Sequence, residues 1–178
     1  MSKEIYQIDS AHSHIGFKVT HMMLARVNGR FKKYSGTVEM ADDNFETAVL
    51  KFKAKVKSIS TNHEERDAHL RSPDFFDADL HKELSFISSA VQKIGDHRYK
   101  IEGFLTMRGL TNHIVLEAIK SEALQDNDGA KRFALNIVGK LNRIKWDMRW
   151  NRPMQSGGIL VSREVLIEID SEFFTPLD

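Results

Sequence analysis

Three histidines near the N-terminus could act together, because His12, His14 and His21 fall within the ten residues HSHIGFKVTH. The rest of that segment reads as a β-strand. His12 and His14 are two residues apart and would point the same way, a spacing found in metal sites built on β-sheets. His21 lies seven residues beyond His14 and would face the opposite side unless a bulge intervenes. A pair of histidines without a third ligand binds zinc weakly. We therefore favour histidines that fix the ends of a strand by hydrogen bonds.

The alternative use of these histidines is catalytic. A metal-dependent hydrolase could employ His12 and His14 together with a distant acid. A second segment, His63-Glu64-Glu65-Arg66-Asp67, only approaches the zinc-protease helix pattern, because the residue four positions after His63 is an aspartate. Arg66, His69 and Arg71 are therefore expected to lie on a solvated helix.

A row of four lysines, at positions 51, 53, 55 and 57, could bind single-stranded nucleic acid. The formal net charge of the chain is only +1, which speaks against a nucleic-acid partner. Like charges on one side of a strand are more typical of solvation and of protection against edge pairing. Trp146 and Trp150 are expected to share a strand face, where they could stack a ring or close one end of a core.

The chain has 178 residues, 41% of them hydrophobic, and no cysteine, which suits one domain over residues 1–178. The N-terminal residues MSKEIYQIDS are polar, and no segment approaches the ~18 consecutive apolar residues of a transmembrane helix. We therefore expect no transmembrane segment. The expected location is cytoplasmic for the sequence as it stands, or periplasmic if an export signal has been removed.

The element pattern is mainly β. Leu50, Phe52, Ala54 and Val56 alternate with the four lysines, and a period of two indicates a half-buried strand. Similar alternation occurs in four other segments, around residues 15–19, 99–105, 133–137 and 165–169. Turn signals such as Asp42-Asp43-Asn44 and Asp126-Asn127-Asp128-Gly129 separate the strands, which predicts antiparallel hairpins in a sandwich or a barrel.

One short helix interrupts the strands, over about residues 62–71. Thr61 and Glu64 form a capping-box pattern, and Pro73 ends the run. Only Ala68 and Leu70 within it are strongly apolar, so this polar helix is expected to lie across a sheet edge or a barrel end. Phe75-Phe76 would supply an apolar plug just after it.

Three glycines, Gly29, Gly103 and Gly139, each sit between two apolar residues on one face of a strand. A glycine inside a strand marks either a sharp bend or a place that something approaches closely. Two interpretations stay open: corner kinks that let a sheet curl, or missing side chains that leave a barrel hollow. On the second, Gly103→Leu would fill the interior while the domain still folds.

An ordered series of motifs makes the chain recognisable. It begins with the segments 6–9, 12–22, 27–31 and 34–36, continues through 60–61, 66–72, 74–77 and 85–86, and ends with 103–111 and 142–143. Together they resemble the YceI-like family, the lipocalin-like polyisoprenoid-binding proteins. One departure is Trp146-Asp147, which stands where the family usually has an aromatic residue followed by glycine.

The resemblance implies an elongated, lipocalin-like antiparallel β-barrel of about eight strands that encloses an apolar tunnel. The implied ligand is a long isoprenoid lipid, an isoprenoid quinone or a polyprenyl phosphate, which the protein would sequester or transport as a homodimer. No catalytic residue, metal or other cofactor is implied. We expect the tunnel to be lined by Phe17, Val19, Phe31, Phe52, Phe86, Ile101, Leu105, Phe133, Leu135, Ile137 and Ile167, with Gly29, Gly103 and Gly139 leaving clearance.

Overall fold

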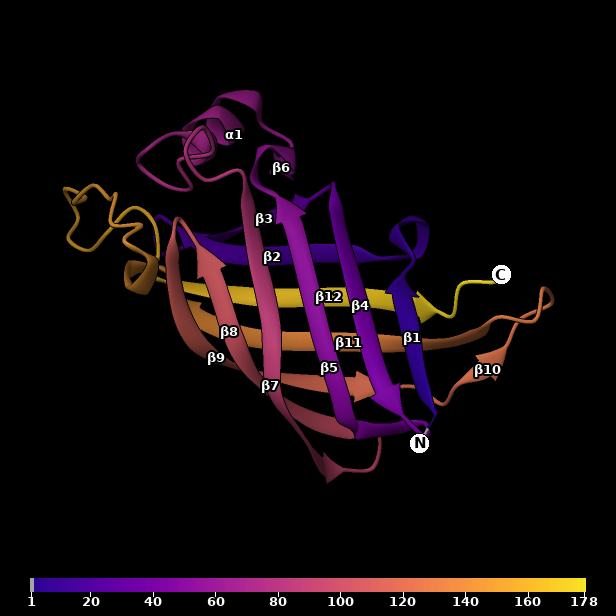
Figure 1. Ribbon diagram of the computed structural model, residues 1–178. Coiled ribbons are helices and arrows are strands. Elements are labelled where there is room, and N and C mark those ends of the chain that lie inside the picture. The colour runs from indigo at the N-terminus through magenta and orange to yellow at the C-terminus, as the bar shows by residue number, and fades with distance from the viewer. Residues whose placement is uncertain (1) are drawn as a thin grey trace.

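A twelve-stranded antiparallel sheet and one α-helix make up the part of the chain that the structure describes, residues 2–178 of a computed structural model (Figure 1). The strands are β1 (Lys3–Ile8), β2 (His14–His21), β3 (Ala25–Phe31), β4 (Tyr34–Ala41), β5 (Asn44–Lys55), β6 (Ile59–Ser60), β7 (Glu83–Gly95), β8 (Arg98–Met107), β9 (Leu110–Lys120), β10 (Leu124–Gln125), β11 (Lys131–Asn142) and β12 (Glu164–Phe174). The helix is α1 (Glu64–Arg71), and short 3-10 turns are η1 (Ser10–His12), η2 (Val56–Ser58) and η3 (Arg143–Trp146).

Eight of these strands close into a barrel, in the order β11-β9-β8-β7-β5-β4-β1-β12 and back to β11. The closing pair runs in register from Arg132 opposite Phe174 to Asn142 opposite Glu164. β2 continues the sheet from β12, and β3 and then β6 extend it further. The predicted mainly β, lipocalin-like antiparallel barrel is therefore confirmed.

The predicted alternation and turns are present in the barrel wall. On β5, Leu50 and Ala54 are buried, and the lysines between them are exposed. The turn between β4 and β5 places Asp42 and Asp43 at positive φ, 53° and 56°, as a tight hairpin requires. One interpretation is wrong: the lysine row does not protect an edge, because β5 lies between β4 and β7.

One end of the barrel is packed solid by aromatic rings. Tyr6 and Phe133 meet edge to face at 4.9 Å, Phe45 lies 6.2 Å from Phe133, and Phe173 stacks on Phe133 at 5.6 Å. The opposite end carries α1, β6 and the irregular segment 147–163, away from both chain termini in Figure 1. The packed end supplies a fixed floor for the barrel interior.

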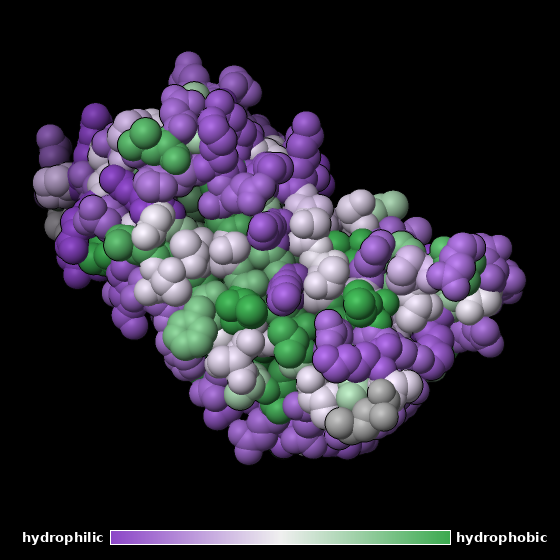
Figure 2. All heavy atoms as spheres, viewed as in Figure 1, coloured by the Kyte–Doolittle hydropathy of each residue, from purple (hydrophilic) through white to green (hydrophobic). Residues whose placement is uncertain are grey.

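The outer wall also carries apolar side chains. Exposed Val49, Ile87 and Phe104 lie on β5, β7 and β8, where Figure 2 shows green residues gathered over the middle of the sheet. Ile87 and Phe104 face each other across the β7–β8 pair.

The predicted helix is present, but its cap differs from the expectation. His63 is the N-cap and its Nδ1 accepts from the Arg66 amide at 3.2 Å, so Thr61 is not the capping residue. Thr61 instead donates to the buried Asp67 carboxylate, from its amide at 2.7 Å and from its hydroxyl at 2.6 Å. This carboxylate ties the helix to the end of β6, which holds α1 over one end of the barrel (Figure 1).

Candidate ligand-binding cavity

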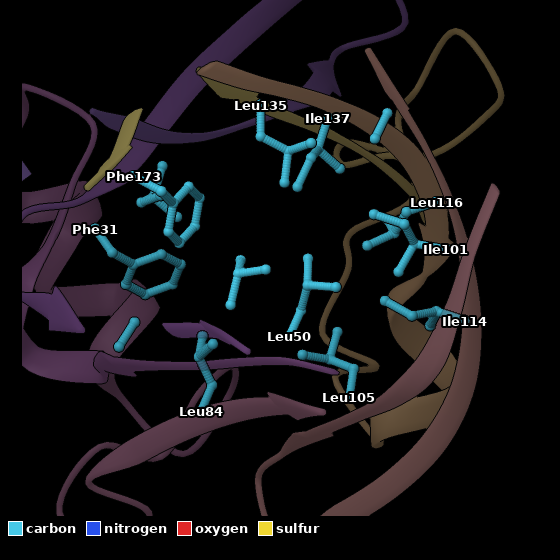
Figure 3. Close-up of a cluster of buried hydrophobic side chains, with 14 of the residues drawn as sticks. Phe31, Leu50, Leu84, Ile101, Leu105, Ile114, Leu116, Leu135, Ile137 and Phe173 are labelled. Atoms are coloured by element: carbon cyan, nitrogen blue, oxygen red, sulfur yellow. The ribbon is translucent and has the colours of Figure 1, made fainter. Parts of the chain in front are cut away.

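A cavity of about 570 Å³ occupies the barrel interior. Every strand of the closed barrel contributes to its wall, from Ile8 on β1 to Ile169 on β12. The labelled side chains in Figure 3 point from opposite walls into the barrel, and all of them except Leu135 line the cavity. The wall is dominated by aliphatic and aromatic groups, and a volume of this size lies within the range of pockets that hold small ligands.

Most of the expected tunnel residues lie on the cavity wall. These are Phe17, Val19, Phe31, Phe52, Phe86, Ile101, Leu105, Ile137 and Ile167. Phe133 and Leu135 do not lie there, although both are buried. Phe133 belongs to the aromatic floor described above, so the expectation that it lines the cavity is wrong.

The expectation that Gly29, Gly103 and Gly139 leave empty space in the tunnel is also wrong. Neighbouring side chains occupy the space next to each glycine. A Cβ on Gly29 would lie 2.2 Å from the Phe17 ring, and a Cβ on Gly139 would lie 2.4 Å from a Leu116 methyl. A Cβ on Gly103 would meet both the Phe86 ring at 2.5 Å and the Ile87 carbonyl oxygen at 2.4 Å. Each glycine thus lets a cross-strand side chain lie flat against the barrel wall. The hollow depends on where those side chains lie, and Gly103→Leu would collide with the backbone of β7.

Several wall residues were not expected. Ile114 and Leu116 on β9 face the cavity, and their alternation with exposed His113 and Val115 could have been recognised in the sequence. Met148, Leu160 and Val161 also line it, but they belong to an irregular segment without a periodic signal. Only the tertiary fold brings that segment to the barrel.

The cavity end nearest α1 is more polar. His63, Glu65 and Arg66 reach the wall from α1 and its cap. Arg66 is held in place by Thr61, since its Nε donates to the hydroxyl at 2.7 Å and its Nη2 to the carbonyl at 2.8 Å. Arg66 is exposed, as expected for a solvated helix, and these two hydrogen bonds hold its side chain beside Thr61 at the cavity wall.

An aromatic cluster borders the same end. The His69 ring lies 4.5 Å from Trp150 and 5.0 Å from Phe75, in edge-to-face geometry. His69 Nε2 contacts an Asp74 carboxylate oxygen at 2.8 Å, which orients the ring. Phe75 and Phe76 both line the cavity, consistent with the apolar plug expected after the helix.

The two tryptophans do not share a strand face. Trp146 ends η3, is fully buried and donates from its indole nitrogen to the Leu105 carbonyl at 3.0 Å, whereas Trp150 borders the cavity. Asp147 between them has φ 61° and ψ 23°, a left-handed conformation. That geometry accounts for the glycine usual at this position in the resembled family, because glycine adopts it without strain.

Arg143 is the most deeply buried charged group at this end, with 3% of its surface exposed. Its Nε donates to the Ser162 carbonyl at 2.9 Å and its Nη2 to the Val161 carbonyl at 3.2 Å, and its Nη1 donates to the Met148 carbonyl. Burial lowers the pKa of the Arg143 guanidinium from its usual value, and the like charge of Arg163 acts in the same direction.

The N-terminal histidines are placed apart, as parity predicts. His14 is exposed, whereas His21 lines the cavity together with Phe17 and Val19 from the same strand. His12 Nδ1 contacts Asp9 Oδ2 at 2.9 Å, and this bond raises the pKa of the His12 imidazole.

A possible metal-ligating group does form around His12, with different members from those expected. It joins Asp9, His12 and Glu172, and no such group of three or more among residues 2–178 includes His14. Both acids are already paired with Arg132, since its Nη1 lies 2.9 Å from Asp9 and 3.1 Å from Glu172. The described residues therefore do not bring His12, His14 and an acid together as the hydrolase interpretation requires.

Comparison with known proteins decides the family. The YceI-like domain profile matches residues 6–173. The chain belongs to the YceI-like family. A UPF0312 protein of Staphylococcus aureus strain USA300 is 31% identical over 172 residues, covering 94% of this chain and 96% of that protein.

Solved structures place the YceI-like chain among barrels of the same shape. The Campylobacter jejuni YceI protein matches with a TM-score of 0.76 and 27% identity, covering 95% of this chain and 96% of that one. Burkholderia cenocepacia BcnA matches with a TM-score of 0.78 at 20% identity, covering 93% and 98%. A polyisoprenoid binding domain from Saccharophagus degradans matches with a TM-score of 0.70 at 13% identity, covering 96% and 98%. At these lower identities the last two show the shared fold. Within the described residues, no helix has the length and apolar character to span a membrane.

Proposed function

We propose that this YceI-like protein binds a long apolar isoprenoid lipid inside the barrel and sequesters or transports it, without catalysing a reaction. The observation that carries the proposal is the cavity of about 570 Å³, with walls of aliphatic and aromatic side chains from every barrel strand. The polyisoprenoid-binding description of the Saccharophagus degradans domain, which shares the fold, supports the same class of ligand.

The energetics of an apolar wall suit such a ligand. Burial contributes about 0.8 kcal/mol for each methylene, so ten buried carbons give on the order of 8 kcal/mol before the costs of association and ordering. Apolar contact is not directional, so the wall tolerates variation along the chain. Selectivity for the head of the ligand then depends on the polar groups at the α1 end.

The competing activities have weaker support. The acids beside His12 are already paired with Arg132, and His14 does not join them. Of the lysine row, Lys55 pairs with Glu83 and Lys57 lies 3.3 Å from Asp79, which reduces the free positive charge on that face. Neither arrangement favours a hydrolase or a nucleic-acid-binding barrel.

The proposal includes a homodimer, which the family resemblance implies. Light scattering coupled to size-exclusion chromatography should then give twice the chain mass of 20.4 kDa. A mass of one chain at all accessible concentrations would remove the homodimer from the proposal and leave the cavity unaffected.

Binding is tested by titrating the protein with geranylgeraniol, a twenty-carbon prenyl alcohol, and following heat and tryptophan fluorescence. We expect saturable binding of one ligand per chain. Val165→Trp should weaken it at least tenfold, because Val165 on β12 faces the cavity. The matched control is Val138→Trp, at an exposed site on the adjacent strand β11. Equal binding by both folded variants, or no saturable binding by the wild type, would contradict the proposal.

A further inference from the structure

Arg143 is a buried positive charge, and the part of the chain that the structure describes gives it no acidic partner. Among residues 2–178, no carboxylate lies within ion-pair distance of its guanidinium, whereas Arg132 contacts three carboxylates, those of Asp9, Asp126 and Glu172. Removing a charge from water is costly unless it is paired. The buried charge of Arg143 therefore lacks a counterion within the described part of the chain.

The acceptors that residues 2–178 offer to Arg143 are all neutral. A guanidinium carries five N–H donors, and the carbonyls of Met148, Val161 and Ser162 are its three acceptors. Those carbonyls fix the orientation of the guanidinium plane without cancelling its charge. The side chain is thus held rigidly in place and retains donor capacity.

The cavity lies beside this charge. Arg143 belongs to the cavity wall, as do Met148 and Trp150, and its Cζ lies 5.8 Å from the centre of the Phe75 ring, another wall residue. The cavity wall is apolar from this point into the barrel. A ligand whose apolar chain lies inside the barrel could therefore place its head group beside Arg143.

The other charged and titratable groups of the wall do not supply the missing anion. They are His21, Lys51, His63, Glu65, Arg66 and His69. Glu65, the one acid among them, is exposed and is not paired with Arg143. Arg66 is occupied by Thr61, and His69 by Asp74. Cationic groups therefore outnumber acidic ones around the cavity.

We infer that the ligand carries an oxyanion, a phosphate ester or a carboxylate, at the head of its apolar chain, and that Arg143 binds this oxyanion as its missing counterion. The inference rests on the proposed function and specifies the ligand's chemistry: a chain with an uncharged head leaves Arg143 unpaired. Guanidinium and oxyanion geometry match through paired N–H donors. Arg143 is then the residue that determines head-group specificity.

The test compares ligands that share one chain and differ at the head. Geranylgeranyl phosphate, geranylgeranoic acid and geranylgeraniol are titrated against the wild type, Arg143→Gln and Arg163→Gln. Arg163 is a matched control, because it is a nearby exposed arginine outside the cavity wall. For the wild type we expect at least tenfold tighter binding of one or both acids than of the alcohol. Arg143→Gln should reduce this ratio to about one, and Arg163→Gln should preserve it.

A purely structural Arg143, acting only to hold segment 143–163 together, would change affinity for all three ligands alike. If Arg143→Gln does not fold, the Nε–H resonance of Arg143 in the wild type provides a second readout, and it should shift with an acid and not with the alcohol. Equal wild-type affinity for all three ligands, or a ratio that survives Arg143→Gln, overturns the inference. Failure of all three to bind overturns the proposed function itself.

Discussion

Phe17 and Phe86 show how single residues set the shape of the interior. Each ring lies over a glycine of the next strand, Gly29 and Gly103 respectively, where a Cβ would be 2.2 Å or 2.5 Å away. The two glycines differ in what else surrounds them. The three nearest atoms at Gly29 all belong to the Phe17 ring, whereas the nearest at Gly103 is a backbone atom, the Ile87 carbonyl oxygen at 2.4 Å.

Alanine at these positions should therefore have unequal effects. Gly29→Ala can be accommodated if the Phe17 ring swings into the cavity, so we expect a destabilisation of about 1 kcal/mol and weaker lipid binding. Gly103→Ala must displace a strand backbone, and we expect about 3 kcal/mol. Urea unfolding measures the loss of stability, and lipid titration measures the loss of affinity. Gly95→Ala is the control, because its added Cβ would make only ordinary contacts with Arg98. Equal stability losses at Gly29 and Gly103 would contradict this account.

At this scale the sequence identified the right positions and misjudged their role. The glycines stand out because each interrupts an apolar face, but a strand pattern does not show which neighbour lies across from it. Phe17 reaches Gly29 only because β2 and β3 pair in that register. Arg143 is similar, since its carbonyl acceptors come from residues 148, 161 and 162, in a segment without periodicity.

At the scale of elements, α1 depends on one buried carboxylate. Asp67 accepts from both the amide and the hydroxyl of Thr61, and the two residues are buried together. Asp67→Ala leaves the Thr61 amide without this acceptor, so we expect a loss of about 1–3 kcal/mol and faster amide exchange throughout α1. The control is Asp79→Ala, whose ion pair with Lys57 is exposed and should contribute less than about 1 kcal/mol. A variant at Asp67 as stable and as protected as the Asp79 control would exclude this anchoring role.

A second element-level device joins both ends of the chain through Arg132. Its Nε lies 2.6 Å from Asp126, and its Nη1 contacts Asp9 and Glu172. The hydrogen bond from Arg132 lowers the pKa of Asp126. Burial raises the pKa of Asp9, but bonds from His12 and Arg132 outweigh it, and the pKa is lowered.

The directions of these pKa shifts determine how the stability of the folded protein changes as the pH falls. A carboxyl whose folded pKa is lowered contributes stability above its unfolded value, near 3.8, and loses it as the pH falls through the folded pKa. His12 acts oppositely, because its raised pKa adds stability below 6.5 that is lost as the pH rises through the folded value. Urea unfolding between pH 2.5 and pH 7 should show a steep acid decline that Arg132→Gln flattens. The same decline in Arg132→Gln as in an Arg98→Gln control would show that this cluster is not responsible.

Element types were more predictable than element ends. The alternation at Leu50–Val56 is local, so burial on one side of β5 follows from the pattern alone. The predicted helix cap was wrong. Thr61 and Glu64 fit the capping-box pattern, but Thr61 donates to the Asp67 carboxylate and His63 is the N-cap. The lysines of β5 were assigned to an edge because strand order is not visible in a single sequence.

At the scale of the whole molecule, the barrel combines a solid end with a hollow one. The Tyr6, Phe45 and Phe133 rings fill the floor, whereas the middle and the α1 end keep about 570 Å³ open. The barrel class was predictable from strand patterning and from family resemblance. The boundary between filled and open interior was not, because it depends on how rings from distant strands pack against one another.

The most direct test of the central claim locates a bound chain. A prenyl alcohol carrying a diazirine at its tail is equilibrated with the protein, activated by light, and mapped by peptide mass spectrometry. The account predicts labels on interior residues such as Ile101, Leu105 and Leu116, and their loss in Val165→Trp. Labels concentrated instead on the exposed outer face, at Ile87, Phe104 and Val115, would contradict it.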